Sequence, residues 1–374
     1  MSKQASKLVV DARMLHASGI GTVLQNVLPV LSEKYRLVLL GNPTDIKQYA
    51  WAANAEVITF EAPIYSIAEQ VQFPFVVPAC DVFLSPHFNV PFLPVRAKRR
   101  AVIIHDVYHL ASKTIHPLHK LYARLLLTAA VSFSDSIVTI SDFTASEIRK
   151  FLRPGGKTIH KITLGVDSGR FNMLPLAPET IKEVRAKYKL PAKFLLFVGN
   201  VKPHKNLIRL VEALALLSGE VTLPLVIVGK KEGFLNGDEN LHKTIKRLQL
   251  EDRIHFTGFV DDAHLPVLYR LAEIFVFPSL YEGFGLPPVE AMASGCATVV
   301  SGAASLPEVC QNASLYVEAT NPDQIATAIK RILQDEMLRN DLVAKGLQLA
   351  QKYTWDKTGE ELLKILSSGT EGTV

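Results

Sequence analysis

The chain has 374 residues, of which 48% are hydrophobic and 21% are charged, a composition typical of globular rather than disordered proteins. This length suits two domains, each large enough to bury its own core. No apolar run approaches the roughly eighteen residues of a membrane-spanning helix, and the N-terminus leads almost directly into an expected strand, so no secretory signal is expected. The three cysteines show no metal-binding spacing and cannot all pair, which favours a reducing cytoplasm; they are Cys80, Cys296 and Cys310.

Charge is distributed unevenly along the chain. The formal net charge of +5 is the sum of +7 in residues 1–170 and −2 in the remainder. The basic half predicts an anionic partner (a membrane surface, a lipid-linked pyrophosphate or a nucleic acid), with a merely solvated surface as the alternative. Nucleic acid is the least favoured partner, because no nucleic-acid-binding motif accompanies the charge.

Short apolar segments alternate with amphipathic ones through the N-terminal half, as in α/β proteins. The expected strands are 8–10, 36–40, 56–60, 81–84, 101–104 and 137–140, and the expected helices are 23–31, 116–131 and 142–150.

The first turn-forming segment contains Gly19 and Gly21, directly before the helix expected at 23–31. It lacks the third glycine and the later acidic residue of a dinucleotide-binding fingerprint. The glycine pair is therefore either a tight turn or a ligand-binding loop.

Polar residues follow two buried strands of the same half. His105 and Asp106 come directly after the strand at 101–104, and Ser141 follows the strand at 137–140. Open α/β sheets bind ligands at the carboxyl ends of their strands, so these residues are candidates for a site. A structural role for His105 is the alternative.

The expected helix at 116–131 carries Lys120 and Arg124 beside a broad apolar face. Together with the basic run 98–100 it could dock on anionic lipid. The favoured interpretation is an ordinary helix packed on its sheet.

The C-terminal half repeats the alternation. Further strands are expected at 194–198, 225–228, 254–257, 274–277 and 315–317, and helices at 322–333, 336–351 and 356–366. Two doubly wound α/β domains follow from this pattern.

The loop after the strand at 194–198 begins with Gly199 and Asn200 and contains Lys202 and Lys205. Two lysines on a strand-to-helix loop that starts with glycine can hold a diphosphate, because Coulomb attraction and N–H donors coincide there. A solvated charged loop is the alternative.

The stretch 274–301 is the most informative of the chain and divides into strand, loop, helix and strand. Prolines at 287 and 288 suit a first helical turn, and Gly295 suits the end of that helix. Glycines in the loop and the N–H groups of the helix start favour an anion. Glu282 and Glu290, eight positions apart, favour a ligand that also carries hydroxyls, such as a nucleotide-sugar. Alternatively, both acids only stabilise the helix dipole.

The segment Glu-Gly-Phe-Gly-Leu-Pro-x-x-Glu-Ala-Met-Ala-x-Gly, which starts at Glu282, resembles the Glu-x7-Glu signature of retaining GT-B glycosyltransferases of family 4. The resemblance implies two Rossmann-like domains that face a central cleft. The expected acceptor-side domain is 1–168, joined by a C-terminal helix at 356–374, and the expected nucleotide-sugar-binding domain is 169–355.

The resemblance also implies roles for the candidate residues. Lysine side chains and amides would stabilise the departing β-phosphate, Glu282 would orient the sugar and Glu290 the ribose, and His105 would position the sugar from the other domain. Many family members carry arginine where this chain has Asn200, which leaves either Lys202 or Lys205 as the main phosphate contact. The expected catalytic residues are His105, Glu282 and Lys205; the other donor-binding residues are Gly19, Gly21, Gly199, Asn200, Lys202, Gly229, Val260, Gly283, Phe284, Gly285, Leu286 and Glu290; Asp106 and Ser141 lie on the acceptor side.

The segments 85–91 and 104–110 are similar to those of bacterial surface-polysaccharide mannosyltransferases. This implies GDP-mannose as donor, with a UDP- or dTDP-sugar as the alternative, and a glycan or lipid-linked acceptor. No Asp-x-Asp motif is present to hold a divalent cation, so neither a metal nor another cofactor is expected. The expected location is the cytoplasm, with docking at the cytoplasmic face of the membrane.

Three other functions fit parts of the same pattern. A nucleotide-sugar epimerase would need acid and base residues on both faces of the sugar. A non-catalytic sugar-nucleotide-binding subunit would not need His105, Lys205 and Glu282 together. A dehydrogenase is disfavoured because the dinucleotide fingerprint is absent.

Overall fold

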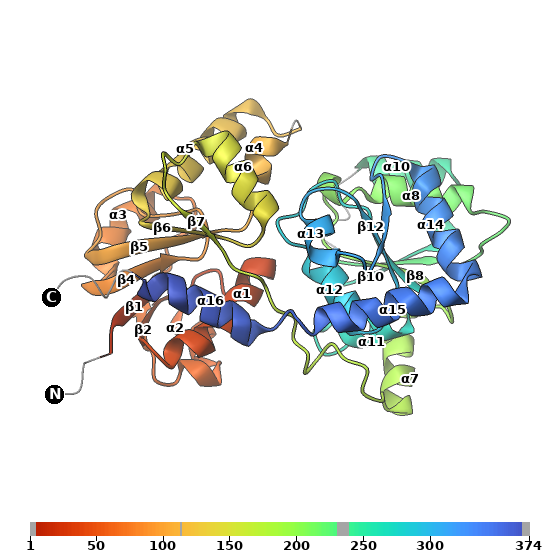
Figure 1. Ribbon diagram of the computed structural model, residues 1–374, viewed down its shortest axis with the longest axis horizontal. Helices are drawn as coiled ribbons and strands as arrows, with labels where there is room; N and C mark the ends of the chain where they lie inside the picture. The colour runs from red at the N-terminus through yellow and green to blue at the C-terminus, as the bar shows by residue number, and fades with distance from the viewer. Residues whose placement is uncertain (1–4, 113, 230–238, 369–374) are drawn as a thin grey trace. The chain divides into compact units, whose positions relative to one another are not determined.

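A computed structural model describes residues 5–112, 114–229 and 239–368. The chain divides into two compact units (Figure 1). Unit 1 comprises Met1–Gly165 together with Trp355–Val374, and unit 2 comprises Val166–Thr354. Each unit contains one parallel β-sheet with helices on both faces.

The sheet of unit 1 has seven strands in the described residues, in the order β3-β2-β1-β4-β5-β6-β7. All of its neighbouring pairs are parallel. The strands are β1 (Lys7–Asp11), β2 (Arg36–Gly41), β3 (Glu56–Thr59), β4 (Cys80–Ser85), β5 (Ala97–Ile104), β6 (Ser136–Thr139) and β7 (Ile159–Lys161). The helices are α1 (Ser18–Ser32), α2 (Pro43–Lys47), α3 (Ile67–Val76), α4 (Tyr108–Ala111), α5 (Pro117–Phe133), α6 (Asp142–Leu152) and α16 (Trp355–Ser367), with a 3-10 turn η1 (Ala50–Ala52).

The sheet of unit 2 has six strands in the described residues, in the order β10-β9-β8-β11-β12-β13, again all parallel. The strands are β8 (Leu195–Val198), β9 (Leu225–Val228), β10 (Ile254–Gly258), β11 (Ile274–Phe277), β12 (Thr298–Ser301) and β13 (Leu315–Val317). The helices are α7 (Pro178–Lys187), α8 (Leu207–Leu216), α10 (Glu239–Arg247), α11 (Leu265–Leu271), α12 (Leu286–Ala293), α13 (Leu306–Cys310), α14 (Pro322–Gln334) and α15 (Glu336–Ala350), with 3-10 turns η2 (Pro203–Lys205) and η3 (Glu251–Arg253).

The central strands are apolar along their whole length because helices cover both faces of each sheet. In β8 and β11 every residue is buried, including Phe197 and Phe277. A strand with one solvated face would alternate apolar and polar residues instead. The continuous runs therefore identify the interior of a parallel sheet.

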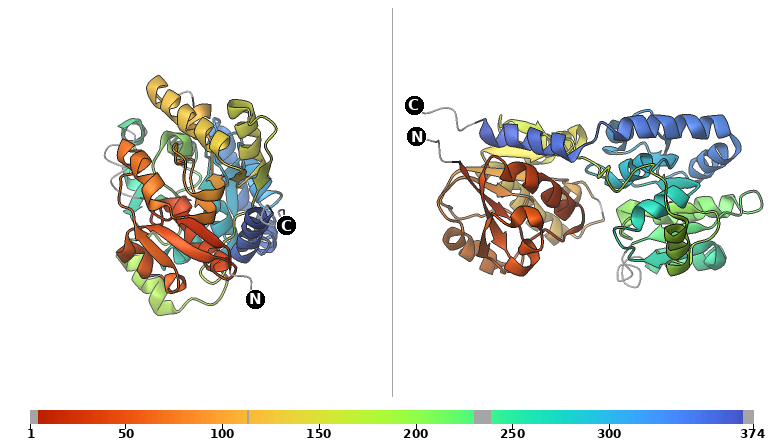
Figure 2. Two further views of the ribbon diagram at one scale, coloured as in Figure 1. Left: turned by 90° about the vertical axis from the view of Figure 1, so that its left-hand side faces the viewer. Right: turned by 90° about the horizontal axis from the view of Figure 1, so that it is seen from below.

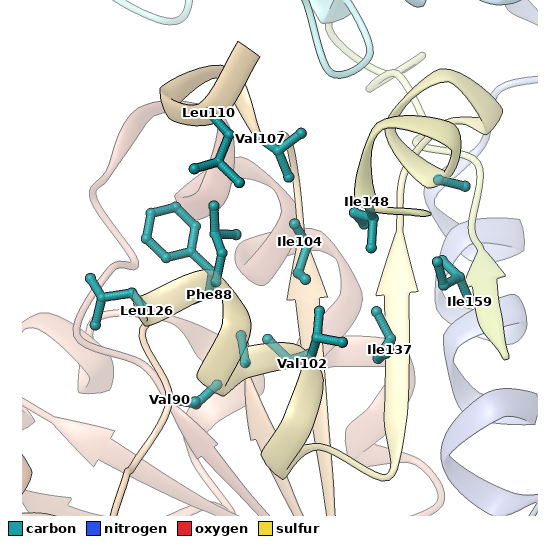
Figure 3. Close-up of a cluster of buried hydrophobic side chains, with 14 residues drawn as sticks. Phe88, Val90, Val102, Ile104, Val107, Leu110, Leu126, Ile137, Ile148 and Ile159 are labelled. Atoms are coloured by element: carbon teal, nitrogen blue, oxygen red, sulfur yellow. The ribbon is translucent and has the colours of Figure 1, made fainter. Parts of the chain in front are cut away.

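One face of the unit 1 sheet is covered by α3, α5 and α6. Side chains of β5 and β6, such as Val102 and Ile137, pack against Leu126 of α5 and Ile148 of α6 (Figure 3). A second cluster on β1, β2 and β4 packs against Phe73 of α3. Both clusters lie on the same face, because Phe83 of β4 pairs with Arg100 of β5, two residues before Val102.

The opposite face of this sheet carries α1 and α16, which lie side by side (Figure 1). A Cβ on Gly359 of α16 would come within 2.6 Å of Val30, so the two helices approach closely there. The backbone N–H of Thr163 donates to Glu361 at 2.7 Å. The last helix, blue in Figure 2, therefore packs on the first unit. It ends at Ser367, and residues 369–374 of the expected helix lie outside the described residues.

Helix α1 starts at Ser18, five residues before the expected start. Gly19 and Gly21 therefore lie in its first turn and not in a loop before it. A Cβ at Gly21 would collide with the carbonyl oxygen of Leu15, whereas one at Gly19 would meet nothing within 4 Å. Glycine at position 21 thus permits the first turn of α1 to pack closely against the backbone of Leu15.

In the basic run 98–100, Lys98 is exposed and pairs with Asp81, whereas Arg99 and Arg100 have structural roles; docking of this run on lipid stays a prediction. Arg99 donates to the carbonyl of Leu366 and to Ser136, and Arg100 donates to the carbonyl of Pro91. Both arginines are half-buried parts of the structure of unit 1. In the parts of the chain that the structure describes, every helix is too short or too polar to cross a bilayer.

Candidate active site

The order of the unit 2 strands reverses between β8 and β11, which are neighbours in the sheet but not in the chain. Ligands of open α/β sheets bind outside the carboxyl ends of the strands at such a switch point. The loop after β8 carries Lys205, and the loop after β11 carries Glu282. Both candidate loops therefore start at the switch point, which is the place in this sheet that most favours ligand binding.

The structure brings Lys205 and Glu282 into direct contact. Nζ of Lys205 lies 2.7 Å from Oε1 of Glu282, and the two side chains are 15% and 12% exposed. The ammonium group also lies 5.0 Å from the ring centre of Phe277, the last residue of β11. A cation and an anion are thus held together at a partly accessible surface, with an aromatic ring behind the cation.

Hydrogen bonds between the two loops fix this pair. Asn206 has a left-handed backbone (φ 61°), and its side-chain amide donates to the carbonyls of Pro278 at 3.0 Å and Ala319 at 2.6 Å. The N–H of Leu280 donates to the carbonyl of His204 at 2.7 Å. The loops therefore form one framework around the charged pair.

Helix α12 starts immediately after the second loop. Its N-cap is Gly285, whose φ of 104° lies in the region that glycine favours. A Cβ there would lie 2.7 Å from Cδ2 of Leu306, so the loop turns through a space too small for a side chain. Buried Ser305 supports the turn by donating to the carbonyls of Glu282 and Phe284.

Both ends of α12 agree with the sequence analysis. Prolines occupy its first turn, where no N–H is needed. Gly295 (φ 69°) follows its C-cap and donates to the carbonyl of Met292, while Cys296 donates to Ala291. This pair of bonds is a Schellman motif. Because Pro287 and Pro288 lack N–H groups, the backbone donors at this end of α12 are those of Gly285 and Leu286, next to the Glu282 loop, where an anion would be stabilised.

Glu290 lies on α12, and its hydrogen-bond partner is a residue other than Lys205 or Glu282. Its Oε2 accepts a hydrogen bond of 2.9 Å from the hydroxyl of Tyr269. Burial raises the pKa of Glu290 to about 7, and the Tyr269 bond and the charge of Arg170 oppose that rise. This carboxyl group can therefore gain or lose a proton near neutral pH.

The other donor-side candidates of unit 2 lie at the ends of its strands. Gly199 follows β8, and Gly229, which follows β9, donates its N–H to the carbonyl of Gly258 at 3.1 Å. Lys202 is exposed, whereas Lys205 on the same loop is turned inward. These candidates differ in exposure: Asn200 is exposed, Gly199, Gly229, Gly283 and Leu286 are partly exposed, and Val260, Phe284 and Gly285 are buried.

In unit 1, His105 follows β5 and lies next to the loop after β4. Its Nε2 lies 2.9 Å from the carbonyl oxygen of Pro86, and because a carbonyl only accepts, this nitrogen carries the proton. Burial lowers the pKa of His105, against the opposing effects of that bond and of Asp106. The ring is therefore neutral at pH 7, and Nδ1 remains an acceptor.

The two acceptor-side candidates have local structural roles. Asp106 accepts a hydrogen bond of 2.9 Å from the N–H of Tyr108, the first residue of α4. Ser141 is fully buried and is the N-cap of α6, where its hydroxyl accepts from the N–H of Thr144 at 3.0 Å. Whether either residue contacts an acceptor stays a prediction.

A buried ionic cluster in unit 1 was missed by the sequence analysis. Arg13 pairs with Asp11 at 2.7 Å and with Glu69 at 3.0 Å, and its guanidinium lies 4.0 Å from the ring centre of Phe60. Asn89 donates to Glu69 at 2.8 Å. The position of Asp11 at the end of β1 was a signal, but nothing in the local sequence indicates Glu69, the distant partner of Arg13.

A cavity of about 310 Å³ borders this cluster. It lies at the carboxyl ends of β1, β2 and β3, and Arg13, His16, Asn42 and Glu61 contribute polar groups to its wall. Such a wall can donate to and accept from hydroxyl groups.

Comparison with known proteins decides the family. Residues 180–348 match the family model described as glycosyl transferases group 1. An O-antigen chain mannosyltransferase B of Escherichia coli is 33% identical over 279 residues, which are 74% of this chain and 71% of that protein. The chain belongs to the glycosyl transferases group 1 family.

Two further comparisons describe how this glycosyltransferase relates to known proteins. The serotype-specific mannosyltransferase WbdA of Escherichia coli is 30% identical over 76% of this chain, which spans about a third (35%) of that protein's length. The structure of Anabaena HepE in complex with UDP and glucose aligns with a TM-score of 0.78 and 19% identity over 97% of this chain and 100% of that one. The expected GT-B class, with two doubly wound α/β units, is confirmed.

Proposed function

We propose that this glycosyltransferase moves a hexose from a nucleoside diphosphate sugar to a glycan or lipid-linked acceptor in the synthesis of a bacterial surface polysaccharide. One observation carries the proposal: the Lys205–Glu282 pair, held at the strand switch point of unit 2 beside the start of α12. A cation and helix N–H groups suit a diphosphate, and a carboxylate beside them suits sugar hydroxyls.

The best candidate for the donor is GDP-mannose. The support is that the Escherichia coli relatives at 33% and 30% identity are named mannosyltransferases. A UDP-sugar is the alternative, since a solved structure of similar fold holds UDP and glucose. Incubation with GDP-mannose, UDP-glucose and dTDP-sugars, with release of the nucleoside diphosphate as the readout, separates these donors.

The mechanism follows from the charges. As the glycosidic bond to the β-phosphate breaks, negative charge grows on that phosphate. Lys205 would stabilise it by moving hydrogen bonds from Glu282 to phosphate oxygens, with the amides at the start of α12 as further donors. Glu282, released in part from Lys205, would accept hydrogen bonds from the sugar. In this proposal Lys205, and not exposed Lys202, is the main phosphate contact.

The proposal includes retention of the anomeric configuration and independence of metals. The family resemblance supports retention. The lysine ammonium and the backbone N–H groups can stabilise the negative charge of the leaving phosphate without a metal ion. NMR of the first product distinguishes retention from inversion. Turnover that vanishes in excess EDTA and returns with Mg²⁺ would remove the metal-independent mechanism.

A non-catalytic sugar-nucleotide-binding subunit is the competing function. It would bind a nucleoside diphosphate, detected by calorimetry, yet release no product from any donor in the panel, even with an acceptor extract. Product release by the wild type that the Lys205→Ala variant lacks would establish an enzyme.

A further inference from the structure

The exposed large hydrophobic side chains of unit 1 gather on one side of the unit. In the described part of this unit, all eleven belong to α3 with the residue before its N-cap, to the loop 92–93 and to α5. The helices α1, α2 and α16 on the opposite face contribute none. These eleven residues, here called the apolar face, are Tyr65, Ile67, Val71, Phe75, Phe92, Leu93, Leu118, Leu121, Tyr122, Leu125 and Phe133.

The three segments of the apolar face contact one another. The hydroxyl of Tyr122 on α5 donates to the carbonyl of Tyr65, just before α3, at 3.2 Å. The N–H of Phe92 donates to Gln70 of α3 at 2.9 Å. The rings of Phe92 and Phe133 lie 6.5 Å apart. The apolar face is therefore continuous and not a set of scattered side chains.

Both helices place apolar residues on their outer side at helical spacing. On α3, Ile67 and Phe75 are each 84% exposed, with Val71 midway between them. On α5, Leu118 and Leu125 are 68% and 60% exposed and lie seven residues apart. The inner sides of the same helices already fill the core. A helix that covers a sheet normally has a polar outer side, so this apolar face indicates a partner.

Positive charge predominates around the apolar face. Residues 86–105 and 107–134 contain no aspartate or glutamate, and the acidic residues nearest to them in the chain are Asp106 and Asp135. Residues 62–80 contain only Glu69, which is fully buried and paired with Arg13. Lys120 and Arg124 of α5 lie among the exposed leucines. An anionic surface is therefore attracted, whereas a second copy of this face would be repelled.

We propose that the apolar face docks on an anionic lipid bilayer, with its aromatic and aliphatic side chains among the acyl chains and its cations at the lipid phosphates. Apolar area and attraction to anionic headgroups together determine the strength of such interfacial binding. The inference goes beyond the proposed sugar transfer, because it concerns a surface of unit 1 that contains none of the candidate catalytic residues.

Co-sedimentation of the full chain with vesicles tests the proposal. We expect binding to vesicles of phosphatidylglycerol and phosphatidylcholine, weaker binding to phosphatidylcholine alone, and a decrease with salt. Ile67→Ser with Phe75→Ser, and separately Leu121→Ser with Leu125→Ser, should each weaken binding about tenfold or more. The matched control is Leu216→Ser with Met337→Ser, two exposed apolar residues of unit 2, which should bind as the wild type does.

Two results would overturn the proposal. One is wild-type vesicle binding by both paired variants, whose fold is checked by circular dichroism and thermal unfolding. The other is a wild-type dimer in light scattering that both variants lose, with no binding to any vesicle, which would assign the apolar face to a second copy. Donor turnover in solution is measured in parallel, so a failure of vesicle binding is distinguishable from a failure of the proposed function.

Discussion

Two ion pairs lie past the carboxyl ends of strands at the switch points of the two units. In unit 2, Lys205 and Glu282 follow β8 and β11. In unit 1, Asp11 ends β1, and Arg13 joins it to Glu69 of α3. The chemical groups are similar, but their surroundings differ.

Most N–H donors of Arg13 are used by groups of the protein. It makes two hydrogen bonds to Asp11, one to the carbonyl of Ala62 and an ion pair with Glu69. Nζ of Lys205, in contrast, has a single hydrogen bond within the described residues, to Glu282. A group whose donors are mostly used within the protein holds a structure together, whereas one with most of its donors left can exchange them with a ligand. The comparison therefore predicts a stability role for the first pair and a functional role for the second.

The largest effect is expected at Arg13. Arg13→Met leaves Asp11 and Glu69 as buried carboxylates without a cation, which should lower the free energy of unfolding by about 3–5 kcal/mol. Urea unfolding measures the change. Arg36→Met, which breaks the exposed pair with Glu56, should cost less than about 1 kcal/mol. Equal losses for the two variants would contradict the structural role of the cluster.

Lys205 should affect turnover instead of stability. Lys205→Ala removes the charge that the proposed mechanism places at the departing phosphate, and turnover should then fall about 10²–10³-fold. Glu282→Ala should lower turnover far more than it lowers nucleotide affinity, which calorimetry measures. Lys202→Ala, an exposed lysine on the same loop, is the matched control. Unchanged turnover in Glu282→Ala would remove its catalytic assignment.

The sequence predicts most of the unit 2 site because its signals are local. The apolar run 274–277 marks a buried parallel strand, the prolines at 287 and 288 mark a helix start, and Gly295 marks its end; the structure has all three. Once the loops at 199–206 and 282–286 are placed after neighbouring strands, the contact of Lys205 with Glu282 follows from the sheet order.

The parts that the sequence does not predict depend on distant residues. Glu69 reaches Arg13 only because α3 crosses the sheet, and α3 itself was not expected. Its apolar residues do not form one stripe: Phe73 faces the core while Ile67 and Phe75 face outward, and Pro74 lies between Phe73 and Phe75. Because apolar residues lie on both the inner and the outer side of α3, the sequence lacks the apolar–polar periodicity that predicts a helix with one buried side.

Protonation provides a third test of the unit 2 site. Glu290 has a pKa of about 7 in the folded chain, above the value of about 4.3 for an unfolded glutamate. The folded state therefore binds the proton more tightly, and its stability falls as pH rises from about 4.5 to 7. Glu290→Gln can still accept the hydrogen bond from Tyr269 but cannot titrate. Its free energy of unfolding should therefore fall by about 2 kcal/mol less between pH 4.5 and 7 than that of the wild type. Urea unfolding of both proteins from pH 4.5 to 8 measures it, and parallel curves would contradict the shifted pKa.

The smallest expected effect is a change in stability when alanine replaces one glycine in each unit. Gly285→Ala forces a side chain into a backbone with φ of 104° and against Leu306, which should destabilise the fold by about 1–2 kcal/mol and shift the loop that holds Glu282. Gly19→Ala lies in the first turn of α1 with nothing within 4 Å and should stabilise by less than about 1 kcal/mol. Thermal unfolding of both variants measures these changes in stability. If Gly285→Ala leaves stability and turnover unchanged, the narrow turn before α12 does not hold the Glu282 loop in place, and the fixed geometry of the Lys205–Glu282 pair must come from Asn206 and Ser305 alone.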